Sequence, residues 1–159
     1  MARTWLQIRV DLVSGRGEEL KPPPGRIFIV GPGHTFSALA DAINQAFARW
    51  DLAHLHEFEL SDGRRVGFVD PDPFEDDVEV EDHEAVKVAQ LVGAGDEFSF
   101  VFDFGDDWRH RCRVLEEKAD PRQEWGSGPL PKQPVPIWGW GLIPDQYGRR
   151  SAAELGLGR

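Results

Sequence analysis

The sequence contains one cysteine, Cys112. A single thiol cannot form an internal disulfide, and it cannot supply the paired cysteines of a zinc knuckle. This scarcity agrees with a reducing compartment. The strand pattern around Cys112 predicts a small buried hydrophobic residue rather than a nucleophile paired with a nearby histidine.

Long apolar runs and a surplus of positive charge are also missing. No stretch approaches the roughly 20 apolar residues of a membrane span, and residues 1–5 lead into a strand pattern without the apolar region of a signal peptide. We therefore expect a cytoplasmic protein with no membrane partner.

The sequence has 18 Lys and Arg residues against 28 Asp and Glu residues, which gives a net charge of −10. Such a chain repels nucleic-acid phosphates over most of its surface, so nucleic acid is not an expected partner.

Apolar residues, in contrast, are plentiful. They make up 40% of the 159 residues and include ten Phe and six Trp, enough for one hydrophobic core. Two domains of half this length would each have a hydrophobic core of only marginal stability. We therefore expect one domain over residues 1–148 and a flexible tail over residues 149–159.

Hydrophobic periodicity predicts strands separated by two helices. The expected strands cover residues 4–12, 26–30, 54–60, 64–69, 98–104 and 108–114, and the helices cover residues 36–49, with Thr35 as N-cap, and 84–92. Residues 121–148 are rich in Gly, Pro and Trp and predict an extended segment packed across the domain. The fold class is α+β: a mostly antiparallel sheet built from hairpins, packed against one main helix and a short second helix.

The last hairpin has the clearest alternation. Phe98, Phe100, Phe102 and Phe104 are expected to enter the core from one strand. Its partner strand places Trp108, His110, Cys112 and Val114 on the apolar face. Arg109, Arg111 and Arg113 then lie on the solvent face, where they balance nearby carboxylates; the alternative is that they form a local basic patch.

Three histidines form the first candidate site. His54 and His56 are expected on the apolar face of one strand and His110 on the apolar face of another, with Asp103, Asp106 and Asp107 close in sequence. Neighbouring strands would bring three imidazoles and a carboxylate together, a donor set that suits zinc or iron. Two alternatives are hydrogen-bonded structural histidines and a metal-free ligand pocket. No cofactor is predicted, and a divalent metal is the alternative.

Two other stretches of the sequence carry residue types that can bind a ligand. Residues 70–84 are strongly acidic, but an EF-hand counted from Asp70 would place Phe74 at position 5 and Glu75 at the glycine position, so we expect a solvated loop. Trp138, Trp140 and Tyr147 are candidates for an aromatic groove that binds a peptide or small ligand. The alternative is that these rings anchor the C-terminal segment to the core.

Two blocks resemble the hallmarks of the plasmid pRiA4b Orf-three-like family: His54–Phe58 after a helix ending at Trp50, and the run Asp103–His110. The similarity extends over about residues 3–148. It implies an α+β fold with an antiparallel sheet and a bacterial plasmid or mobile-element origin, since members are labelled insertion-element passengers of resolvase type. It implies no established activity. Relatives carry C-terminal cysteines where this chain has Trp138–Gly148, so a metal role of those cysteines does not transfer.

These observations predict a non-enzymatic accessory domain that binds an unidentified protein or small molecule. Burying titratable groups on apolar strand faces is costly, which points to a pocket around His54, His56, Asp106, Trp108 and His110. One alternative is a metal-dependent hydrolase, with the three histidines as ligands and Asp106 or Asp107 as a further ligand or general base. Another is a resolvase-associated DNA protein, for which the chain lacks a helix-turn-helix signal. The oligomeric state is not predicted.

Overall fold

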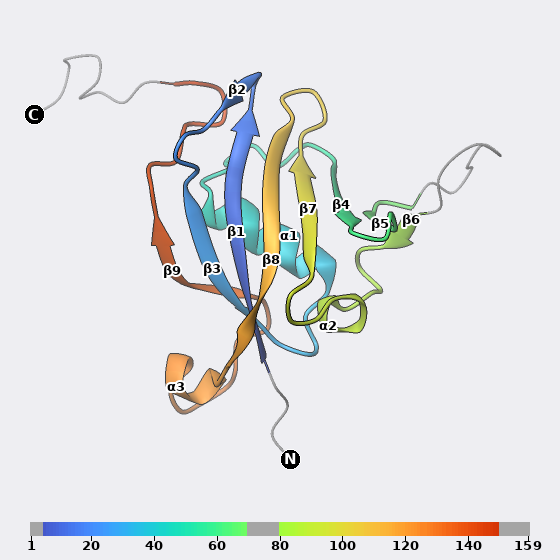
Figure 1. The fold of residues 1–159 in the computed structure, drawn as a ribbon, viewed down its shortest axis with the longest axis vertical. Helices are drawn as coiled ribbons and strands as arrows, with labels where there is room; N and C mark the ends of the chain where they lie inside the picture. The colour runs from blue at the N-terminus through green and yellow to red at the C-terminus, as the bar shows by residue number, and fades with distance from the viewer. Residues whose placement is uncertain (1–4, 70–79, 150–159) are drawn as a thin grey trace, which may run out of the picture.

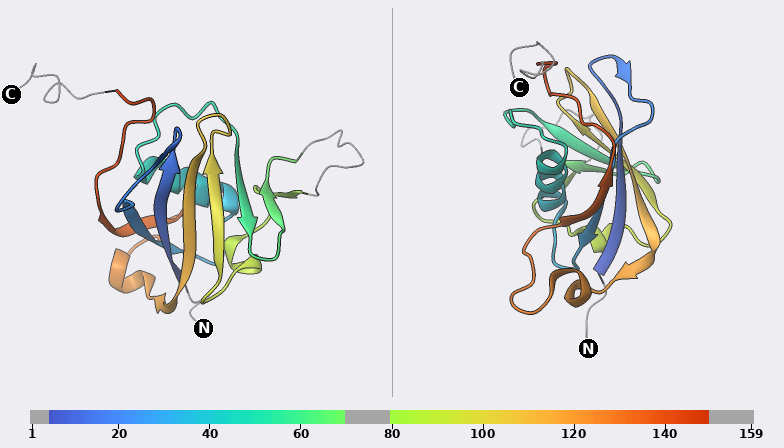
Figure 2. Two further views of the ribbon diagram at one scale, coloured as in Figure 1. Left: turned by 45° about the horizontal axis from the view of Figure 1, so that its top comes forward. Right: turned by 90° about the vertical axis from the view of Figure 1, so that its left-hand side faces the viewer.

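The computed structural model describes residues 5–69 and 80–149. Within these ranges nine strands form one sheet, and the main helix crosses one face of it (Figures 1 and 2). The strands are β1 (Trp5–Gly15), β2 (Glu18–Glu19), β3 (Gly25–Val30), β4 (His56–Leu60), β5 (Arg65–Gly67), β6 (Val80–Asp82), β7 (Glu97–Phe102), β8 (Trp108–Ala119) and β9 (Val135–Trp140). The helices are α1 (Phe36–Ala46), α2 (Val88–Leu91) and α3 (Pro121–Trp125).

The strand order is β6-β5-β4-β7-β8-β1-β3-β9, with β2 paired to the end of β1. Every pairing is antiparallel except that of β5 with β6. The predicted hairpins β4–β5 and β7–β8 are present, and α1 is the main helix. A mostly antiparallel α+β fold is therefore confirmed.

Helix α1 begins where its sequence predicts. The Thr35 side chain accepts a hydrogen bond from the Ala38 N–H at 3.1 Å, a standard N-cap. Phe36, Leu39 and Ile43 are buried at helical spacing. The helix ends at Ala46, and Ala48 has a positive φ of 57° that turns the chain away. The three- and four-residue spacing of apolar residues in the sequence also predicts Trp50 on this face, and that prediction is wrong, since Trp50 is half exposed. No helix in the described ranges has the length and apolar character of a membrane span.

The core lies between α1 and the sheet. Alternate residues of β1, β7 and β8 are buried there as predicted, and the three arginines of β8 point to the open face. Cys112 is fully buried, and burial raises the pKa of its thiol. The prediction for Phe104 is wrong. Asp103 adopts a positive φ of 63° directly after β7, which ends the alternation and leaves Phe104 half exposed.

Several boundaries also differ from the sequence prediction, and α2 covers only Val88–Leu91 of the helix predicted over residues 84–92. His54 precedes β4 instead of lying on it. The segment 121–148 is not simply extended, because it contains α3 and the edge strand β9, which pairs with β3. The end of the acidic stretch forms β6, since it hydrogen-bonds alongside β5. Residues 70–79 of that stretch, and the predicted tail beyond Arg149, lie outside the described residues.

Candidate functional site

The residues predicted to form one site fall into three groups with different contacts. His54 and Asp103 lie near Tyr147, His56 pairs with His83, and Trp108 and His110 lie in the core. The two other aspartates make different contacts, Asp107 through its side chain and Asp106 through its backbone carbonyl. Asp107 forms an ion pair with Arg109 at 2.8 Å, and the Asp106 carbonyl accepts the Arg16 N–H at 2.7 Å.

The first group is a hydrogen-bonded chain around Tyr147. The Tyr147 hydroxyl donates to Asp51 Oδ2 at 2.8 Å, so its oxygen accepts from His54 Nε2–H at 2.7 Å. On the other side of the imidazole, His54 Nδ1 lies 3.5 Å from Asp103 Oδ2. Both ring nitrogens of His54 therefore face groups of the protein itself.

A fully buried glutamine completes this group. Gln146 Oε1 accepts the N–H groups of Trp50 and Asp51, both at 2.9 Å, and its Nε2 donates to the Asp51 carbonyl at 2.8 Å. We call residues 144–147, bound in this way to residues 49–54, the C-terminal latch. Sequence analysis missed Gln146 and Asp51 because a single glutamine in an aperiodic segment carries no periodic signal.

Replacing Tyr147 with Phe is expected to raise the pKa of Asp51 toward its ordinary value. The hydrogen bond from Tyr147 is the largest cause that lowers this pKa, and its carboxylate partner raises the pKa of Tyr147 to about 12. The ring contact with Trp50, at 5.1 Å between centroids, survives the change. Carboxyl-carbon NMR titration measures the shift. The pKa of Asp62, lowered by contacts with Arg64, is an internal control that should stay constant. An unchanged pKa at Asp51 would contradict the assignment.

The second group is a buried pair of histidines. His56 Nε2 and His83 Nδ1 are 3.0 Å apart, and the Phe68 ring packs on both imidazoles. Burial, and to a smaller extent the neighbouring His83, lowers the pKa of His56 to about 4. His56 is therefore neutral at pH 7. Sequence analysis missed His83 because the surrounding acidic residues favoured a solvated loop.

The third group lies under the end of α1. His110 Nδ1–H donates to the Phe100 carbonyl at 3.1 Å, and burial lowers the pKa of His110 to about 4. The Arg49 guanidinium covers the Trp108 ring at 4.2 Å, and burial lowers the pKa of Arg49 to about 10. Four buried atoms have no hydrogen-bond partner among the described residues: Asn44 Oδ1, Arg49 Nη1, Trp108 Nε1 and His110 Nε2.

The three predicted metal ligands are not brought together. Strand β7 lies between β4 and β8. The ring of Phe100 on β7 packs against both imidazoles, with centroid distances of 5.5 Å to His56 and 5.1 Å to His110. His54 lies outside β4 and faces Tyr147 instead. Within residues 5–69 and 80–149, no three His, Cys, Asp or Glu side chains are placed to hold one metal ion.

The predicted aromatic groove is divided as well. Tyr147 belongs to the C-terminal latch, whereas Trp138 and Trp140 lie on β9. Trp140 packs over Gly25, with the Arg9 guanidinium 4.7 Å from its ring, and Trp138 is exposed at the sheet edge. The two tryptophans border a cavity of about 440 Å³ that Tyr147 does not line.

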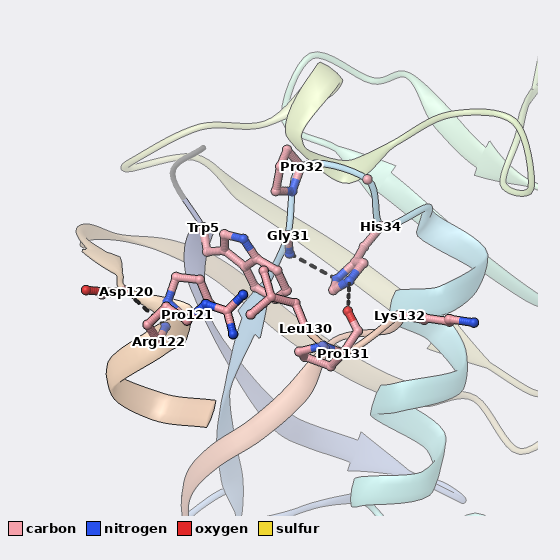
Figure 3. A pocket seen from close by; sticks show the side chains of 11 residues that line it. Trp5, Gly31, Pro32, His34, Asp120, Pro121, Arg122, Leu130, Pro131 and Lys132 are labelled. Carbon is pink, nitrogen blue, oxygen red and sulfur yellow. Dashed lines mark hydrogen bonds between the residues drawn. The ribbon is translucent and has the colours of Figure 1, made fainter. Parts of the chain in front are cut away.

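A larger cavity lies at the end of the sheet that carries α3. Its volume is about 630 Å³, within the range of small-molecule sites. We call it the Trp5 cavity (Figure 3). Four segments of the chain contribute its wall: Trp5 at the start of β1, residues 31–34, residues 120–122 and residues 130–132.

His34 joins two of these segments. Its Nδ1 accepts the Gly31 N–H at 2.9 Å, so the proton lies on Nε2, which donates to the Pro131 carbonyl at 3.0 Å (Figure 3). The Trp5 ring meets the imidazole edge-on at 5.0 Å. Burial lowers the pKa of His34, which keeps the imidazole neutral. Sequence analysis missed this cavity because Gly31–Gly33 signalled only a break after a strand.

The opposite wall comes from α3 and the turn that follows it. Asp120 Oδ1 accepts the Arg122 N–H at 2.9 Å and so caps α3. Leu130 packs with Trp5 and Ile29 in a small hydrophobic cluster separate from the main core. The wall is therefore attached to the sheet by apolar contacts and by the His34–Pro131 hydrogen bond.

The fold has been seen before. The crystal structure of MM3350, a protein of unknown function from Methanosarcina mazei Go1, matches with a TM-score of 0.63 at 20% identity, over 87% of this chain and 71% of that chain. At this identity the likeness shows the fold alone. No curated protein matches the chain. The model of the family described as plasmid pRiA4b ORF-3-like protein matches residues 5–130, which include both hallmark blocks, and the chain therefore belongs to this family.

Proposed function

We propose that this chain is a non-enzymatic binding domain that takes a small molecule into the Trp5 cavity. The observation that carries the proposal is the cavity itself, about 630 Å³ with a wall of Trp5, Leu130 and three prolines. A mostly apolar concave site with a few polar groups is the usual form of a ligand pocket. The site thus differs from the pocket predicted around His54 and His110.

The arrangement of the titratable groups supports binding over catalysis. Both nitrogens of His34 are bonded to backbone groups, so its imidazole has no free nitrogen to exchange a proton with a ligand. The Asp120 carboxylate caps α3 and points away from the cavity (Figure 3). His54 and His56 are likewise occupied by Tyr147 and His83.

The cellular setting is part of the proposal. The family name refers to a plasmid, which supports an accessory protein of bacterial plasmid or mobile-element origin. A cytoplasmic location is supported by the single buried cysteine, since proteins of oxidising compartments commonly pair their thiols.

An NMR screen of small neutral, cationic and anionic aromatic and aliphatic compounds tests the function. Ligands are expected to shift the backbone amides of Gly31, Gly33 and Lys132. A Cβ at Gly33 meets no atom within 4 Å, so Gly33→Leu adds a branched side chain to the cavity wall with no clash at its Cβ. We expect this variant to weaken binding at least tenfold.

Gly93→Leu is the matched control. Gly93 also has free space around its Cβ position and lies on the turn before β7, and it does not line the cavity. This variant should bind as the wild type does. The proposal fails when no compound shifts the cavity amides, or when ligands bind equally well to Gly33→Leu.

A further inference from the structure

One cationic side chain is directed into the Trp5 cavity. Figure 3 shows the Arg122 guanidinium pointing toward Trp5 and Leu130, whereas the side chains of Asp120 and Lys132 point away. His34, the remaining titratable group of the wall, is buried and bonded through both nitrogens. Arg122 therefore supplies the positive charge of the cavity.

This guanidinium is held in place and still has donors to offer. Its Nη1 donates to the carbonyls of Gly126 at 3.2 Å and Gly128 at 2.6 Å, which uses both hydrogens of that nitrogen. Among the described residues, its Nε and Nη2 have no hydrogen-bond partner, and no carboxylate forms an ion pair with Arg122. Such an edge matches the two oxygens of a carboxylate.

Within residues 5–69 and 80–149, the exposed Arg122 side chain has no carboxylate partner, although the chain is acidic overall. Asp and Glu number 28 against 18 Lys and Arg, and the neighbouring carboxylate of Asp120 bonds to the Arg122 backbone instead of its guanidinium. The rest of the wall presents flat or rigid apolar surfaces: Trp5, Leu130, Pro32, Pro121 and Pro131. Such surfaces suit a planar ring.

We propose that the Trp5 cavity binds a small aromatic carboxylate, with the carboxylate on Arg122 and the ring against Trp5, Leu130 and the prolines. This inference rests on the proposed binding function and adds the chemical class of the ligand. The neutral imidazole of His34 shapes the cavity and leaves the carboxylate to Arg122.

The test compares phenylacetate with phenylacetamide, which has nearly the same shape without the charge. Dissociation constants are measured by NMR from the amides of Gly31 and Gly33. We expect wild-type protein to bind phenylacetate at least tenfold more tightly. Arg122→Gln should abolish that preference, and Arg122→Lys, which keeps the charge without the planar fork, should retain part of it. Arg113→Gln removes the same charge from the exposed face of β8 and should leave the preference intact.

The outcomes separate this inference from the proposed function. Equal binding of both probes, with shifts at Gly31 and Gly33, overturns the inference and keeps the binding function. If neither probe binds while other compounds of the screen do, the inference is also overturned and the binding function is kept. A preference that survives in a natively folded Arg122→Gln protein also overturns the inference. A cavity that binds no compound overturns both.

Discussion

Lowering the pH from 7 to 4 is expected to remove several kcal/mol of stability from this protein. His56 and His110 are buried, and both have a pKa of about 4 instead of the ordinary 6.5. A shift of this size corresponds to roughly 3 kcal/mol for each histidine, because one pKa unit is about 1.4 kcal/mol. The loss is comparable to a large fraction of the total stability of a domain.

The direction follows from proton linkage. Above pH 6.5 both histidines are neutral in the folded and unfolded chains, so their full contribution is present. Below pH 6.5 the unfolded chain takes up protons that the folded chain does not, and stability falls until the pH reaches the folded pKa of about 4. Between these values each histidine contributes a slope of about 1.4 kcal/mol per pH unit.

Urea denaturation at pH 7, 6, 5 and 4 measures this slope. His110→Leu should lower stability at pH 7 and reduce the slope by about 1.4 kcal/mol per pH unit, since one titrating group is lost. Val88→Ala is the control, because it removes buried apolar surface from α2 and changes no titrating group. An unchanged slope in His110→Leu would show that His110 is protonated readily in the folded protein.

Gly15→Ala is expected to destabilise the protein by about 3 kcal/mol or more. A Cβ at Gly15 would lie 1.9 Å from Cε3 and 2.4 Å from Cζ3 of Trp108. Trp108 is buried, and the Arg49 guanidinium covers its ring at 4.2 Å, so the indole has little room to move. Overpacking of a well-packed core typically costs 1–3 kcal/mol and occasionally more.

Equilibrium denaturation of Gly15→Ala beside Gly33→Ala isolates the clash. No atom lies within 4 Å of the Cβ position of Gly33, so that change should stay within about 0.5 kcal/mol of the wild type. Combining Gly15→Ala with Trp108→Leu should cost less than the sum of the single changes, because the smaller side chain relieves the contact. A loss below about 1 kcal/mol in Gly15→Ala would contradict the packing described around Trp108.

Local patterns predicted the elements that contact the core. Alternation identified the buried faces of β1, β7 and β8, and Thr35 marked the start of α1. Predictions from these local patterns failed where one residue changes the direction of the backbone. Asp103 and Ala48, both with positive φ, end the alternation before Phe104 and the helix before Trp50. A side-chain pattern does not show such a turn, because the φ angle of a residue other than glycine depends on the packing around it.

The sequence by itself determined the fold class, the apolar faces and the membership of a family whose hallmark blocks are present. The tertiary structure alone decided which residues meet. The strand order places β7 between His56 and His110, and the packing of the chain pairs His56 with His83. The same long-range packing brings Trp5, His34 and Arg122 to the wall of one cavity. The physical reason is that periodicity depends on the geometry of a single element, whereas a site depends on which elements become neighbours. Long-range packing decides which elements become neighbours, and the spacing of residues within one element does not predict it.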